Sequence, residues 1–274
     1  MLPARWIDLR RAAPLEFHAA YAGLAEAQDA FARPLVVWGR VAAHVSLGQS
    51  QTLAELDPGV AVPVVRRPLG GGAVWVDEDQ LSYALVAPLR RAPRRHEDWY
   101  GWALAPAVAT FAAFGLRVTR VGEDLWAAGR KIAGSGAATI GRSAVVASSF
   151  LLRFPRERFA AAVAAPTPRY RARVREGLAR AMTDWAREGA VPQPEAVAAA
   201  FRRALASELG WDAVPSAPDA REAACIAEWR RELAEPIETG GRRRVPDGIK
   251  LNAALSLVAG EHGDATLVQG AVPG

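Results

Sequence analysis

Two arginines and three consecutive glycines lie close together in the segment VVRRPLGGGAVWVD, Val64–Asp77. Three glycines in a row carry no Cβ, so backbone N–H groups can approach a ligand closely and φ can be positive. Arg66 and Arg67 add charge that suits a phosphate or a carboxylate. An equally good interpretation of a glycine triplet by itself is a flexible hairpin loop with solvated arginines.

A second group of residues that could do chemistry lies in GRKIAGSG, Gly129–Gly136, which we predict to be another glycine-rich loop. Of the 34 basic residues in the chain, all but Lys131 and Lys250 are arginine. Where arginine serves almost everywhere, a retained lysine indicates a position that needs a compact, titratable ammonium group. If strands bring the two segments face to face, their arginines and Lys131 form a concave basic site.

The elements that must hold these segments are those of an α/β (α+β) fold. Apolar residues at three- and four-residue spacing predict an amphipathic helix over residues 14–28 and another over 96–114, with Pro106 near its start or at a kink. Short β-prone runs predict strands at 35–38, 41–47, 60–65, 73–76, 81–86, 116–121, 125–128 and 144–154. His44 falls inside one apolar strand, and we interpret it as a hydrogen-bonded core histidine rather than a catalytic one.

The remainder of the chain is predicted to be helical, ending in a hairpin. Helices are expected at 169–185, 194–209 and 219–233, followed by one alternating strand at 249–258 with Lys250 outward, a turn at 260–263 and a return strand at 265–268. We divide the chain into a catalytic domain at 1–190 and a segment at 191–274 that holds helices and a partial accessory hairpin. Such a short hairpin must pack on the main domain or on a partner.

Composition narrows the class of protein. The chain has 274 residues, 51% of them hydrophobic and 23% charged, which is typical of one large or two unequal globular domains. No segment resembles a signal peptide or reaches membrane-spanning length, which predicts a cytoplasmic protein without a membrane partner. The net charge of +5 is dispersed apart from Arg242–Arg244, so nucleic acid is not expected as a partner. Cys225 is the only cysteine, which excludes disulfides within the chain, and we expect it to be buried.

Both segments resemble blocks of the lipoate–protein ligase A family, in the superfamily of biotin/lipoate ligases and octanoyltransferases. VVRRPLGGGAVWVDEDQLSYALV resembles RRxSGGGAVxHDxGNLNYS, and EDLWAAGRKIAGSGA resembles NDLxxxGRKIxGxA. The order and spacing of the blocks agree as well. The resemblance implies a mixed, largely antiparallel sheet flanked by helices, with an acyl donor and an adenylate held in one cleft.

The resemblance also implies a reaction and roles for particular residues. Lipoate and ATP with Mg²⁺ would give lipoyl-adenylate, whose acyl group passes to a lysine of a lipoyl carrier domain or a glycine cleavage H-like protein. Lys131 would contact the carboxyl and α-phosphate oxygens, and Asp124 would help place Mg²⁺ or the adenylate. The other residues implied to bind the nucleotide and acyl group are Arg67, Gly70, Gly71, Gly72, Ala73 and Gly134. Preorganised cations and amides would stabilise the negative charge that develops in such a reaction.

Several positions depart from the family pattern. Leu69 stands where the family has Ser, Val76 where it has His, Glu123 where it has Asn, and Ala147 within a segment that carries histidines in the family. These changes remove polar side chains around the implied acyl-adenylate. They leave open whether lipoate or octanoate is the acyl donor.

Three functions remain in view, with an ATP-dependent lipoate–protein ligase favoured. The second is an ATP-independent octanoyl or lipoyl transferase; known transferases of this superfamily use a cysteine nucleophile, and Cys225 is predicted to lie on a helix far from the lysine segment. The third is a non-catalytic binder of acyl groups or carrier domains. A biotin ligase is less favoured, because the GRGRxGRxW signature is absent. The C-terminal hairpin resembles the opening of the ligases' small accessory domain, so a separate accessory-domain polypeptide is a further expected partner.

Overall fold

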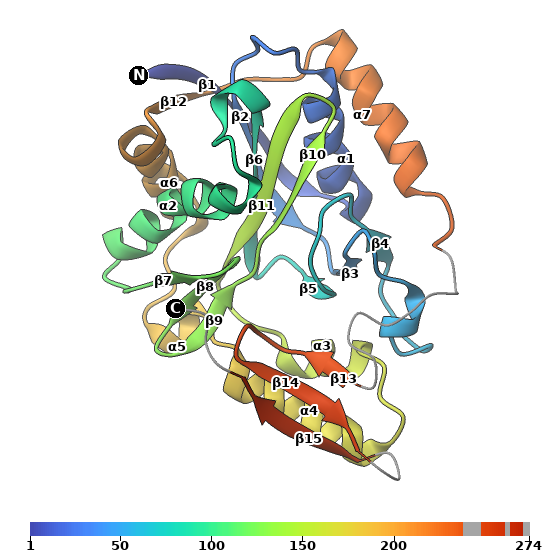
Figure 1. Cartoon of the computed structure of the whole chain (residues 1–274). Coiled ribbons are helices and arrows are strands. Elements are labelled where there is room, and N and C mark those ends of the chain that lie inside the picture. Colours follow the sequence, from blue (N-terminus) through green and yellow to red (C-terminus); the bar gives the residue numbers. More distant parts are fainter. Residues whose placement is uncertain (238–247, 261–263, 271–274) are drawn as a thin grey trace.

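The computed structural model describes residues 1–237, 248–260 and 264–270, and a six-stranded sheet lies at its centre (Figure 1). The strands follow the order β10-β11-β6-β2-β1-β12; β1 pairs in parallel with β2 and β12, and the other neighbours are antiparallel. Their bounds are β1 Leu2–Ala12, β2 Leu35–Val41, β6 Gln80–Pro88, β10 Gly136–Ile140, β11 Ser143–Leu151 and β12 Trp211–Pro215. The predicted α/β class with a mixed sheet is confirmed, although β1, β10 and β12 were not predicted.

Helices cover both faces of this sheet (Figure 1). On one face lie α1 (Pro14–Ala27) and α7 (Ala220–Leu233), and on the other lie α2 (Trp99–Ala113) and α6 (Pro194–Leu209). Because side chains alternate along a strand, β2 sends Leu35 and Val37 into the core under α1 and sends Val36 and Trp38 into the core under α2 and α6. The sheet therefore separates two hydrophobic cores.

Helix α1 is buried on nearly all its sides rather than amphipathic as predicted, because α7 packs on its outer surface. The two backbones approach so closely that a Cβ at Gly23 would lie 2.5 Å from the Cα of Ile226. Cys225, next to this contact, is half-buried rather than buried as expected. Only glycine at position 23 permits this packing.

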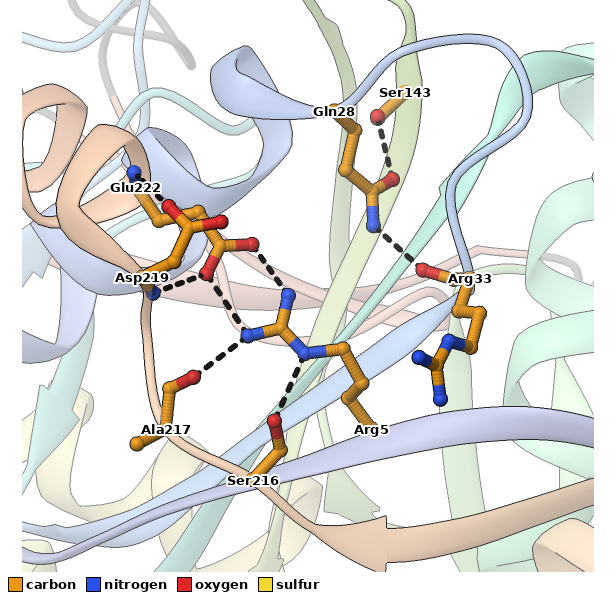
Figure 2. A network of polar contacts seen from close by, with 8 residues as sticks. All are labelled: Arg5, Gln28, Arg33, Ser143, Ser216, Ala217, Asp219 and Glu222. Carbon is orange, nitrogen blue, oxygen red and sulfur yellow. Dashed lines mark hydrogen bonds and ion pairs between the residues drawn. The ribbon is translucent and has the colours of Figure 1, made fainter.

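A polar network fixes the start of α7 against β1, and Figure 2 shows the Arg5 side chain at its centre. Arg5 donates to both carboxylate oxygens of Glu222, to the Ser216 hydroxyl at 3.0 Å and to the Ala217 carbonyl at 2.8 Å. The Asp219 carboxylate accepts from the Glu222 amide at 2.9 Å and caps the helix. The connection from β12 to α7 is thereby held on the sheet.

Helix α2 is present as predicted but begins at Trp99 rather than at residue 96. Pro106 lies in its interior, so of the two predicted places for this proline the one near the helix start is wrong. Two three-stranded sheets flank the main one. The first has the order β4-β3-β5, with bounds β3 His44–Leu47, β4 Val64–Arg66 and β5 Val74–Val76. The second has the order β7-β8-β9, with bounds β7 Thr119–Val121, β8 Asp124–Ala127 and β9 Arg130–Ala133. These two sheets carry the candidate site. Single 3₁₀ turns occur at Leu53–Glu55, Leu89–Arg91 and His96–Asp98.

Helices and a small sheet pack below the main sheet in Figure 1, with bounds α3 Arg156–Ala162, α4 Pro168–Ala181, α5 Trp185–Glu188, β13 Gly248–Lys250, β14 Leu255–Ala259 and β15 Ala265–Gln269. The small sheet packs on α4, in a core that includes Leu178, Leu251 and Leu257.

Two predictions for this region are wrong. The helix expected at 169–185 is interrupted before α5, and the strand expected at 249–258 is two strands that pair antiparallel. The break occurs because Asn252 is buried rather than outward: its carboxamide donates to Ala181 O at 2.9 Å and accepts from the amides of Ala254 and Leu255. The Arg242–Arg244 run and most of the predicted turn at 260–263 lie outside the described residues. The division at residue 190 stays a prediction. Across the described segments, the helices are all too short or too polar to cross a membrane.

Candidate active site

The glycine segment crosses the end of β3 and is not a hairpin loop. Strands β4 and β5, which flank it in the chain, pair with opposite edges of β3, one parallel and one antiparallel. The amide of Arg67 donates to Leu47 O and the amide of Gln49 donates to Leu69 O, both at 2.9 Å. Gly71 takes a φ of +103°, which favours glycine. The segment is thus a tightly held crossover.

The guanidinium of Arg67 holds this crossover from within. Nη1 donates to Ser46 O at 2.8 Å and lies 3.4 Å from Ser46 Oγ, while Nη2 donates to Gly70 O at 2.9 Å and Gly72 O at 2.8 Å. The side chain is buried. All four Nη hydrogens therefore have acceptors within the protein, and Arg67 joins β3 to both ends of the glycine triplet.

Lys131 lies on strand β9, not in a glycine-rich loop as predicted. Ala128, with a φ of +46°, and Gly129, with a φ of +74°, form the two-residue turn that joins β8 to β9. Because side chains alternate on a strand, Lys131 and its neighbour Arg130 point in opposite directions. Lys131 faces the glycine segment's side of the sheet, whereas Arg130 forms an ion pair with Glu188 at 2.9 Å.

The ammonium of Lys131 is paired with the carboxylate of Asp124, with Nζ and Oδ1 2.8 Å apart and both side chains largely buried. Gly134 lies against the ammonium, because a Cβ there would be 2.8 Å from Nζ. The backbone of Lys131 is also fixed: its carbonyl accepts from the amide of Thr183 at 2.8 Å, and it forms an isolated parallel bridge with Met182. Lys131 is therefore anchored at both its main chain and its side chain.

A pocket of about 230 Å³ brings the predicted residues together. Its lining includes Arg67, Gly71, Gly72, Ala73, Asp124, Lys131 and Gly134. Gly70 contributes its carbonyl oxygen to Arg67 instead. Arg66 lines a separate pocket, beside Trp229. The expectation of two facing basic segments is therefore correct for Arg67 and Lys131 and wrong for Arg66 and Arg130.

The rest of the pocket wall is largely apolar. All four positions that depart from the family pattern line it: Leu69, Val76 and Ala147 are apolar, and Glu123 is acidic. Phe17 and Tyr21 of α1 also line it. At the other end, the lining comes from α3, α4 and the C-terminal sheet and includes Phe159, Val174, Leu178, Ile249 and Leu251. Lys250 is exposed but also borders this end. Such a pocket can hold an extended apolar chain beside a charged group at Lys131.

Sequence reasoning missed the polar residues behind the glycine segment. His18 and Ser46 line the pocket, and His44 lies directly behind them, 3.3 Å from His18 between the two Nε2 atoms. His44 is fully buried and donates or accepts through both ring nitrogens, which confirms its interpretation as a hydrogen-bonded core histidine. The available signal was His18 standing three residues before Tyr21 on an otherwise apolar helix, where the two side chains share a face.

Charge in this region follows burial. Burial, with smaller contributions from His44 and Arg67, holds the pKa of His18 well below its ordinary value. Burial lowers the pKa of His44 to about 4, although its hydrogen bond to the Ala42 carbonyl acts in the opposite direction. Both imidazoles are therefore neutral near pH 7.

A resident metal centre is not evident in the described part of the chain, where no three His, Cys, Asp or Glu side chains cluster as a metal site would need. Asp124 supplies one buried carboxylate next to the pocket. One carboxylate suits a Mg²⁺ ion that arrives with substrate phosphates and keeps several waters.

Comparisons with solved structures identify the fold. A bi-partite lipoate protein ligase structure with its E2 lipoyl domain from Thermoplasma acidophilum matches with a TM-score of 0.80 and 17% identity, over 89% of this chain and 100% of that chain. A lipoate-protein ligase A bound with ATP matches with a TM-score of 0.73 and 17% identity, over 84% and 95%. LipL1 of P. falciparum in complex with lipoate matches with a TM-score of 0.66 and 13% identity, over 98% and 85%.

Sequence comparison leads to the same family. Comparison with curated protein sequences gives no match. The family described as the lipoyl protein ligase A/B catalytic domain matches residues 23–207, which is more than half of the chain and contains both motif segments. The resemblance drawn from those segments is confirmed: this chain belongs to the lipoyl protein ligase A/B catalytic domain family.

Proposed function

We propose that this protein is a lipoate–protein ligase, which activates lipoate with Mg·ATP to lipoyl-adenylate and transfers the acyl group to a lysine of a lipoyl carrier domain. Membership in the family supports an enzyme of the ligase or transferase type. The observation that carries the proposal is the pairing of Lys131 with Asp124 in a pocket that the glycine segment also lines.

In this proposal Lys131 contacts the carboxylate of lipoate and the α-phosphate. Adenylation places negative charge on the phosphate and the transferred carbonyl, and a preorganised ammonium in a largely buried site stabilises it. The Asp124 carboxylate keeps the ammonium in place before substrates bind and then helps hold the magnesium ion of Mg·ATP. The amides of Gly71, Gly72 and Ala73 supply further donors.

Arg67 takes a modified role in the proposal. Because its Nη hydrogens are used by the carbonyls of Ser46, Gly70 and Gly72, its contribution to binding phosphate is its charge and the shape it gives to the glycine segment. The apolar ends of the pocket accommodate the acyl chain and the adenine ring, with Leu69, Val76 and Ala147 forming part of the wall.

The transferase alternative lacks a nucleophile at the pocket. Cys225, the only cysteine in the sequence, lies on α7 and is not among the described residues that line the pocket. A covalent acyl-thioester route needs the thiol at the reacting carbonyl. This position of Cys225 favours the adenylate route.

Pyrophosphate release tests the proposal. Purified protein with Mg·ATP is assayed with lipoate, octanoate or biotin, with and without a lipoyl domain or a glycine cleavage H-like protein, and the carrier is then examined by mass spectrometry. A ligase releases pyrophosphate with lipoate and adds a lipoyl group to the carrier. Acyl transfer without ATP would support the transferase, and tight lipoate binding with neither product would support a non-catalytic binder.

The same assay addresses the accessory partner. One matching structure is described as bi-partite, which supports the proposal that a separate accessory polypeptide completes this protein, most directly at the small C-terminal sheet. A stimulation of carrier modification by such a polypeptide would bear this out. The expected cytoplasmic location stays a prediction.

A further inference from the structure

A continuous chain of polar side chains runs behind the pocket from α1 to the glycine segment. The Tyr21 hydroxyl lies 3.1 Å from Nδ1 of His18, and Nε2 of His18 lies 3.3 Å from Nε2 of His44. Nε2 of His18 also lies 3.4 Å from Ser46 Oγ, and Ser46 in turn receives Nη1 of Arg67. Tyr21, His18, His44 and Ser46 are all buried. The proposed function does not use the two histidines.

The hydrogen positions on His44, His18 and Tyr21 follow from one fixed hydrogen bond. Nδ1 of His44 lies 2.8 Å from the Ala42 carbonyl, which can only accept, so Nδ1 carries the hydrogen. In a neutral imidazole the other nitrogen is unprotonated, so Nε2 of His44 accepts a hydrogen bond from Nε2–H of His18. Nδ1 of His18 is therefore unprotonated as well, and it accepts from the Tyr21 hydroxyl.

The network cannot take up an additional proton without losing or reversing a hydrogen bond. Nε2 of His18 and Nε2 of His44 share a single hydrogen, so a second one between them would set two donors against each other. Nδ1 of His18 could take a proton only if the Tyr21 hydroxyl turned from donor to acceptor. Burial opposes a positive charge on either ring, and so does the Arg67 guanidinium that faces the pair. The chain thus has one stable arrangement, in which Nε2 of His18 is a donor.

The same hydrogen is shared with Oγ of Ser46, which lies 3.4 Å from Nε2 of His18. Ser46 offers its carbonyl and its hydroxyl to Nη1 of Arg67, whose Nη2 holds the carbonyls of Gly70 and Gly72. Any change at His18 therefore reaches the glycine triplet through two side chains.

We propose that His18 is a positioning residue for the glycine segment: its one Nε2–H, shared between Nε2 of His44 and Oγ of Ser46, fixes Ser46, and through it the Arg67 guanidinium that shapes Gly70–Gly72. The consequence for catalysis rests on the proposed ligase function, whereas the coupling to the glycine segment does not. The Tyr21 hydroxyl and His44 act by imposing the Nε2–H tautomer on His18.

Hydrogen exchange measured by mass spectrometry tests the coupling without any activity. His18→Phe keeps a ring of similar size but removes the donor, and Ser46→Ala removes the hydroxyl between His18 and Arg67. Each should speed exchange of the amides in residues 69–74 about tenfold, the factor that corresponds to losing about one hydrogen bond. His18→Gln places an amide donor near the former Nε2 and should restore most of the protection.

The matched control is His96→Gln, because His96 is exposed and does not line the pocket, so the change should leave the glycine segment as it is. Since Ser46 Oγ also contacts Arg67 directly, Ser46→Ala does not isolate His18. If His18→Phe fails to fold, Ser46→Ala and the protonated nitrogen of His18 in ¹⁵N spectra decide together. Wild-type exchange at residues 69–74 in folded His18→Phe or in Ser46→Ala would overturn the proposal. So would ¹⁵N spectra of the wild type that place the His18 hydrogen on Nδ1.

Enzyme assays on the same variants distinguish a failure of this inference from a failure of the proposed function. If the wild type releases pyrophosphate with lipoate, His18→Phe should lower kcat/KM about tenfold or more and His18→Gln should recover most of it, at similar melting temperatures. If the wild type is inactive with every acyl substrate, the proposed function is wrong. Hydrogen exchange at residues 69–74 then still shows whether His18 is coupled to the glycine segment. An active wild type with an equally active His18→Phe would contradict the inference alone.

Discussion

Replacing Gly48 with alanine tests how strictly the site depends on the crossover at the end of β3. Gly48 follows β3 directly, and a Cβ built there would lie 2.0 Å from the carbonyl oxygen of Gly71. Contacts of a real Cβ below 3.0 Å are essentially never observed, so the two backbones must separate by about 1 Å. The Cβ position is fixed by the backbone of residue 48 and the Gly71 oxygen is a main-chain atom, so no side chain can turn aside to relieve the overlap.

The displaced atoms belong to the glycine triplet that Arg67 holds on either side, at Gly70 O and Gly72 O. A misplacement of about 1 Å at a positioning group costs about 10²-fold in rate. Forcing a methyl group into a closely packed contact also costs about 1–3 kcal/mol of stability. We therefore expect Gly48→Ala to fold, to melt at a lower temperature and to lose about 10²-fold in kcat/KM for lipoate-dependent pyrophosphate release.

The control is Gly189→Ala, because Gly189 has no atom within 4 Å of a built Cβ and adopts an extended φ of 174°. Steady-state kinetics and melting curves are measured on the wild type and both variants. Gly189→Ala should match the wild type in rate. A wild-type kcat/KM for Gly48→Ala would refute the reasoning, since it would mean that the glycine segment can shift without consequence.

Three further predictions follow from the same structure. Lys131→Ala should keep the fold and lose about 10²–10³ in rate. Lys131→Arg should recover little of that rate, because a planar guanidinium does not fit beside Gly134, whereas Lys250→Arg should have nearly the wild-type rate. Steady-state kinetics on the three variants check these outcomes. The pKa of His44 is about 4 in the folded protein and 6.5 ordinarily. As the pH falls, the unfolded chain therefore takes up this proton before the folded protein does, and the free energy of unfolding should fall between pH 6.5 and 4 by up to about 3 kcal/mol from this group. Urea titrations measure this, and a midpoint that does not change with pH would contradict it. Gly23→Ala should lower the urea midpoint by the equivalent of about 1–3 kcal/mol, because a Cβ there meets the backbone of α7 at 2.5 Å.

Elements with local signals could be predicted closely from the sequence. Helix α6 has the predicted bounds, because Pro194 suits the first turn and Gly210 takes the left-handed conformation that ends it, with a φ of +67°. Strand β1 could not be predicted, because its partners are β2 and the distant β12, and pairing rather than pattern makes it a strand. The break at Asn252 in a predicted strand could not be predicted either, because the residue that its side chain binds, Ala181, lies far away in the sequence.

The candidate site divides in the same way. Arg67, the glycines and Lys131 could be identified because their motifs are contiguous, and their meeting in one pocket agrees with that expectation. The opposite directions of Lys131 and Arg130 could not be predicted, because Gly129 suggested a loop where the chain makes a two-residue turn into a strand. His18 and Ser46 come from different elements, and only the fold brings them together.

Residues 181–183 connect two parts of the molecule that lie far apart in the sequence. Asn252 of the small C-terminal sheet holds the carbonyl of Ala181, and the next two residues, Met182 and Thr183, bridge and bond to the main chain of Lys131. The small sheet and strand β9, which carries Lys131, are therefore connected through residues 181–183. If a macromolecule bound to the small sheet changed the conformation of this segment, it would change the affinity of the pocket for its ligand. The ligand would then change the affinity for the macromolecule by the same factor.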